Sequence, residues 1–155
     1  MWLASLGKER IDEVFDPEIA VKRAINYYRE QGYNDIWIEV RLKGILDRNK
    51  LTDVWQEGSI SKDYEFGILT NEIYQAWSGM KASEYKTYKG IKKESLSDNM
   101  TDIEVALTDL GEITTRELAK KHKPYGLEQN KKIAQLGGML QKLQEMISKK
   151  ILGNL

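Results

Sequence analysis

The chain has 155 residues, with 24 basic and 24 acidic side chains, one histidine and no cysteine. This is the length of one ordinary domain, and the lack of cysteine excludes disulfides, thiolate zinc sites and cysteine nucleophiles within this sequence. No apolar run approaches the roughly 20 residues that a membrane-spanning helix needs, and the apolar residues 1–6 are too few for a signal peptide, so we expect a cytoplasmic protein.

Helix-start and helix-stop signals divide the first 60 residues into two helices. Asp16, Pro17 and Glu18 supply a capping side chain, a proline at the first helical position and an acid in the first turn, which predicts a helix that ends near Gly32. The next helix is predicted from residue 34 or 35 to about 57. One broad stripe of it is expected to be well buried: Trp37, Val40, Arg41, Gly44, Arg48, Leu51 and Trp55.

A third helix is predicted from Asp63 to Gly79, because its large apolar residues recur at helical spacing. A short helix over 83–88, stopped by Gly90, should follow. Tryptophans and tyrosines stack on bases in some nucleic-acid-binding proteins. Here Trp37, Trp55 and Trp77 fall on apolar stripes, so we expect them in the core.

Residues 101–104 read Thr-Asp-Ile-Glu, which predicts a capping box at the start of a helix over 101–121. We expect its apolar face to be Ile103, Leu107, Leu110, Ile113 and Leu118. The acids Asp98, Asp102, Asp109 and Glu112 should then form a solvated face rather than a magnesium site. Residues 98–115 hold five acids and no base, and residues 116–155 hold nine bases and three acids. Matching of the helix dipole explains part of this asymmetry.

The last segment carries apolar residues at steps of three and four, close to a heptad pattern. We predict that it buries Leu136, Leu140, Leu143 and Ile147, and that part of the covering surface is a second copy of the chain, giving a homodimer. A helix of the same domain is the alternative. Gly137 and Gly138 interrupt the pattern and are expected to let the segment swing away. The predicted fold is all-α: a compact multi-helix domain over 1–138 with a C-terminal helical extension over 139–155. We expect the C-terminal helix to be long.

Catalytic motifs are missing from the sequence. His122 stands among lysines, which disfavours metal binding, and neither a P-loop nor a Gly-x-Ser-x-Gly motif occurs. We therefore expect no catalytic residue, metal or cofactor. One segment could bind nucleic acid, because its lysines alternate with tyrosines around a turn glycine. Its candidate contacts are Lys86, Tyr88, Lys89, Lys92 and Lys93; the alternative is an ordinary soluble helix–loop junction.

Residues 89–104, KGIKKESLSDNMTDIE, resemble a stretch typical of DNA-damage-inducible protein D and related prophage antirepressor proteins of the BRO type. The similarity extends through residues 41–48, 67–80, 110–118 and 126–134, in ungapped blocks between about 2 and 138. It implies a regulatory role in the DNA-damage (SOS) response or in phage control, and no enzymatic activity. Three features depart from the family pattern. The chain is expected to begin where the N-terminal BRO-type or KilA-N-type domain of longer relatives ends, Ser97 stands where arginine is expected from the family pattern, and a leucine-rich end stands in place of a more basic helix.

Two functions compete on this basis. The first is a non-enzymatic regulatory module that contacts DNA, or a DNA-bound protein such as a repressor or a recombination filament, through residues 86–93 and the basic end of the helix over 101–121. The second is a helical interaction or oligomerisation domain without nucleic-acid affinity. A metal-dependent nuclease that uses the aspartates is the third and weakest hypothesis.

Overall fold

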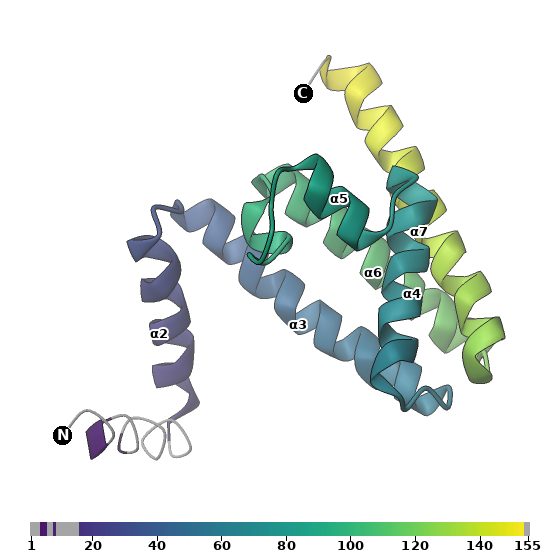
Figure 1. The fold of residues 1–155 in the computed structure, drawn as a ribbon, viewed down its shortest axis with the longest axis horizontal. Helices are drawn as coiled ribbons and strands as arrows, with labels where there is room; N and C mark the ends of the chain where they lie inside the picture. The colour runs from purple at the N-terminus through teal and green to yellow at the C-terminus, as the bar shows by residue number, and fades with distance from the viewer. Residues whose placement is uncertain (1–3, 6–7, 9–15, 154–155) are drawn as a thin grey trace. The chain divides into compact units, whose positions relative to one another are not determined.

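The computed structural model describes residues 4–5, 8 and 16–153, and it confirms the all-helical prediction for them. Six α-helices and no strand occur in this part of the chain. The helices are α2 (Pro17–Glu30), α3 (Asp35–Glu57), α4 (Asp63–Ser78), α5 (Ala82–Tyr88), α6 (Asp102–His122) and the long α7 (Gly126–Leu152), with one 3-10 turn at Ser97–Asn99 (Figure 1). Every helix in the described ranges is too short or too polar to cross a membrane. Most of residues 1–15 lie outside the described residues, so the expectation about residues 1–6 stays a prediction.

The predicted helix starts are confirmed by the capping contacts. The Asp16 carboxylate accepts the amide N–H of Glu18 at 3.1 Å, and Pro17 occupies the first turn of α2. At α6, the Thr101 hydroxyl accepts the N–H of Glu104 at 3.2 Å, while the Glu104 carboxylate accepts the N–H of Thr101 at 2.8 Å. Each contact satisfies a backbone donor that the helix leaves free, which is why these residues fix where the helices begin.

The chain forms two compact units, residues 1–39 and 40–155, so the boundary falls within α3. The described part of the first unit is held by aromatic rings: Tyr33 stacks on Trp37 with centroids 3.8 Å apart, and Tyr28 meets Trp37 edge-on at 5.2 Å. The second unit contains the main core, as expected for Trp55. Its fully buried cluster is Leu51, Trp55, Ile60, Leu69, Ile73 and Ala134, with Trp77 packed against it.

Helix α7 packs on both α4 and α6 through Gly137 and Gly138, and this contact overturns the predicted hinge. The helix is continuous across both glycines, and therefore across the expected boundary at 138/139. A Cβ on Gly137 would collide with the Thr115 hydroxyl and lie 3.0 Å from the Gly111 carbonyl oxygen; one on Gly138 would collide with the Ile73 carbonyl. The glycines are there because close helix contact leaves no room for a side chain.

The prediction of which face of α6 is buried was wrong, because α6 buries a stripe of polar residues. Ile103 and Leu110, expected on its buried face, are 43% and 38% exposed. Asp109 and Glu112, expected in solvent, are buried. The residues that α6 buries are Val105, Thr108, Asp109, Gly111, Glu112, Thr115 and Ala119. The small residues of this set allow α7 to pack closely, and the acidic ones form ion pairs with cations of α3. Complementary groups on the neighbouring helices, rather than hydrophobicity, therefore determine which face of α6 is buried.

Candidate functional site

The lysine-rich segment at 86–93 is on the surface, but a carboxylate offsets part of its charge. Lys92 and Lys93 are exposed and Lys86 is half-buried. The Glu94 carboxylate accepts the amide N–H groups of Lys92 and Lys93 at 3.1 and 3.0 Å. Backbone hydrogen bonds, including these, lower the pKa of Glu94, which therefore stays anionic beside the two lysines.

Lys89 belongs to the structure of the segment rather than to its exposed rim. Its ammonium donates to the Glu104 carboxylate at 2.9 Å and to the Asn99 carbonyl at 3.3 Å, and it lies 5.7 Å from the centre of the Tyr85 ring. Tyr88, by contrast, is 76% exposed and stacks on Tyr85 with ring centroids 6.1 Å apart. Of the five candidate contacts, Tyr88, Lys92 and Lys93 are therefore the ones most open to a ligand.

Helix α7 has a second apolar side, which we call its outer face. Seven apolar side chains on it are 43–74% exposed: Leu136, Met139, Leu140, Leu143, Met146, Ile147 and Ile151. Six of the seven lie between 136 and 147, and the first five of these line an open hollow of about 610 Å³ together with Ala76 of α4, Leu118 of α6 and Lys142. The last turns of α7 extend beyond the neighbouring helices of this unit (Figure 1). The four residues predicted as an interaction seam, Leu136, Leu140, Leu143 and Ile147, thus share one face, and it is half open to solvent.

The buried charges of α6 are paired with α3. Lys43 bridges Asp47 at 2.6 Å and Asp109 at 2.7 Å, and Arg116 donates to the other Asp47 oxygen at 2.9 Å. The Lys43 hydrogen bond keeps the pKa of Asp47 far below its ordinary value, whereas burial raises the pKa of Asp109. These contacts join residues 66 to 69 positions apart in the sequence and fasten α6 to α3.

Arg48 and Glu112 make the neighbouring pair, at 2.7 Å. The guanidinium also donates to the Thr70 hydroxyl of α4 and lies 5.2 Å from the centre of the Trp55 ring. Burial raises the pKa of Glu112, and the Arg48 charge opposes that rise. Removal of the cation would leave a buried carboxylate without its partner, which is the costly way to break such a pair.

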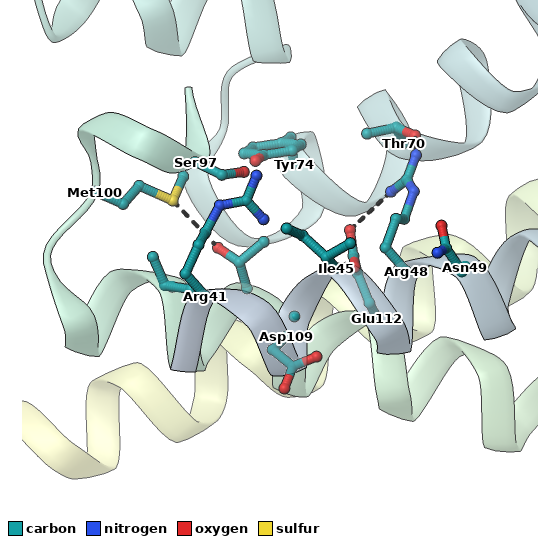
Figure 2. A pocket seen from close by; sticks show the side chains of 13 residues that line it. Arg41, Ile45, Arg48, Asn49, Thr70, Tyr74, Ser97, Met100, Asp109 and Glu112 are labelled. Atoms are coloured by element: carbon teal, nitrogen blue, oxygen red, sulfur yellow. Dashed lines mark hydrogen bonds and ion pairs between the residues drawn. The ribbon is translucent and has the colours of Figure 1, made fainter. Parts of the chain in front are cut away.

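A cleft of about 310 Å³ opens beside these pairs, between α3, α4, α6 and the Ser97–Asn99 turn (Figure 2). The Arg41 guanidinium points toward Tyr74 and Ser97, and its Nε donates to Asp98 at 2.9 Å. Tyr74 is buried, and burial raises the pKa of its hydroxyl, which stays protonated at neutral pH. Because both arginines of the cleft are already paired with carboxylates of the protein, the cleft has little uncompensated charge with which to bind a charged ligand.

In the described residues, no three histidine, cysteine, aspartate or glutamate side chains gather into a group that could hold a metal ion. His122 is exposed at the end of α6. Three of the four acidic residues considered as a magnesium site are instead in ion pairs: Asp98 with Arg41, Asp109 with Lys43 and Glu112 with Arg48. The fourth, Asp102, is exposed at the start of α6.

Comparison with protein-family models and with curated proteins finds no match to this chain. The resemblance to DNA-damage-inducible protein D therefore stays a prediction.

Sequence reasoning missed the polar network between α3 and α6. One signal for it was present: Arg41 and Arg48 lie on the stripe of α3 that was expected to be buried. A charged residue at a core position needs a partner of opposite charge, and the five acids of 98–115 were available. The pairing itself could not be derived, because the partners are far apart in sequence.

Proposed function

We propose that this chain is a non-enzymatic binding module, and that its outer face on α7 receives an amphipathic helix of a partner protein. The observation that supports this is the exposure of seven large apolar side chains on one side of a single helix. Contiguous apolar surface of this kind is uncommon on proteins that work alone, and it marks interaction sites.

The spacing of these side chains suits a helix as the occupant. Leu136, Leu140, Leu143 and Ile147 follow one another at i, i+4, i+7 and i+11, which is the row that a second helix packs against. From the family resemblance, the expected partner is a protein that acts on DNA, such as a repressor or a recombination filament. A second copy of the chain is the alternative occupant.

The test is a photo-crosslinking amino acid placed at Leu143 in the full chain and expressed in cells. The matched control carries the same group at Ile103, which is 43% exposed on α6 and does not line the hollow. We expect irradiation to join a different protein to position 143 and not to position 103. Crosslinks at both positions alike, or at neither, would reject the surface; crosslinks between two copies would replace the partner protein by a homodimer.

A second candidate function is contact with nucleic acid, and Tyr88, Lys92 and Lys93 are the observation in its favour. An exposed ring can stack on a base, and two exposed lysines can neutralise phosphates. Replacement of Lys92 and Lys93 by alanine should weaken DNA binding about equally for all sequences and reduce the salt slope by about two phosphate contacts. Fluorescence anisotropy with labelled DNA at several salt concentrations measures both quantities, and no affinity of the parent at low salt would dismiss this function.

A further inference from the structure

We infer that the partner helix of the outer face carries acidic residues along one edge of its apolar stripe. This inference rests on the proposed function and adds the chemistry of the partner. It comes from the charges that α7 places beside its exposed apolar residues.

The charged residues of 139–152 are three lysines and one glutamate. The glutamate is already engaged, because Glu145 binds Lys149 at 2.6 Å within the same helix. Lys142 and Lys150 have no ion-pair partner among the described residues, and both are exposed. The end of the outer face therefore offers two uncompensated cations and no free anion.

The two free lysines lie in one row of the helix. Lys142, Met146 and Lys150 follow at i, i+4 and i+8, next to the apolar row of Leu143, Ile147 and Ile151. Lys142 also lines the hollow itself. A helix that packs on the apolar row passes both ammonium groups, which are about 12 Å apart along the axis. Acids spaced by two turns on the edge of that helix would meet them.

A second copy of this chain fits the same row poorly. It would bring its own Lys142 and Lys150 to the interface, and its one nearby acid, Glu145, is held by Lys149. Like charges brought together oppose association, and opposite charges favour the correct partner. The lysines thus act against a homodimer and in favour of an acidic partner.

The experiment uses two labelled synthetic helical peptides with the same leucine face, one with glutamates and one with lysines along the edge. We expect the full chain to bind the glutamate peptide about tenfold more tightly, from two exposed ion pairs made in one case and two repulsions in the other. Fluorescence anisotropy measures both affinities. The difference should disappear in about 1 M salt, where the screening length is about 3 Å.

The double variant Lys142→Glu/Lys150→Glu should reverse the preference. The matched control, Lys62→Glu/Lys121→Glu, makes the same charge change at two exposed lysines outside the outer face and should leave the preference unchanged. Equal binding of both peptides, unaltered by the α7 variant, would overturn the acidic partner and leave the docking surface standing. Failure of both peptides to bind would count against the docking surface itself, and so against the proposed function. Sedimentation that shows a dimer which excludes both peptides would overturn the inference in favour of a second copy.

Discussion

Replacement of Gly137 by alanine is a direct test of how α7 is seated. In an open helix the change would stabilise the fold by about 1 kcal/mol, because alanine is the better helix former. Here the new methyl group would collide with the Thr115 hydroxyl, and both the Thr115 Cβ and the Gly111 carbonyl oxygen would be 3.0 Å away. Rotation of the threonine relieves only the first contact, so α7 must move.

Overpacking of a filled core costs about 1–3 kcal/mol, and three close atoms place this site at the upper end. With the helical gain of about 1 kcal/mol subtracted, we expect a net loss near 2 kcal/mol. That loss corresponds to a fall of about 4–8 °C in the melting temperature for a chain of this size. Urea unfolding followed by tryptophan fluorescence measures the free energy directly.

Gly67 provides the matched control, since it lies within α4 with no atom within 4 Å of an added Cβ. Gly67→Ala should stabilise the fold by about 0.5–1 kcal/mol. Addition of Thr115→Ala to Gly137→Ala should recover part of the loss, because it removes the nearest colliding atom. If Gly137→Ala is as stable as Gly67→Ala, α7 does not pack on α6 as described here.

Three further outcomes follow from the buried charges. Asp47→Asn should destabilise the fold more at pH 7 than at pH 3 in urea titrations: the pKa of Asp47 is lowered by folding, so its contribution is present above its ordinary pKa and is lost on acidification. A loss that is the same at both pH values would contradict this. Arg48→Met should lower the free energy of unfolding by about 3 kcal/mol, because it leaves Glu112 buried without its cation. The double variant Arg48→Met/Glu112→Leu should recover most of this loss, and equal losses in the single and double variants would show that the pair is not coupled. Lys89→Ala should lower the melting temperature without a specific effect on DNA binding, since its ammonium is bound internally, and an unchanged melting temperature would refute that role.

Local signals predicted where the helices begin and end. Asp16 and Thr101 bond to amide groups two or three residues away, so the sequence alone contains both partners. Which face of each helix is buried was harder to predict. The α6 stripe of Ile103 and Leu110 was the more hydrophobic choice, yet it is exposed because α3 and α7 supply better complements to the polar stripe.

In the candidate site, too, the features set by nearby residues could be predicted, and those set by distant residues could not. The apolar row of α7 was evident from spacing, since Leu136, Leu140, Leu143 and Ile147 lie within four turns. The role of Gly137 was not evident, because a pair of glycines in a helix is equally consistent with a flexible point and with a close contact between helices. Only the position of Thr115, 22 residues earlier, decides between them.

The ion pairs between α3 and α6 also determine how these two helices are aligned. Apolar side chains tolerate sliding, because any one of them can fill the place of another. If α6 slid by one turn, about 5.4 Å, Thr108 or Arg116 would stand opposite Arg48, and Glu112 would be buried without its cation. We therefore expect that replacing the whole network by leucine and methionine would preserve stability while permitting more than one helix register. The polar contacts would then be the reason that the sequence selects a single packing from several of similar energy.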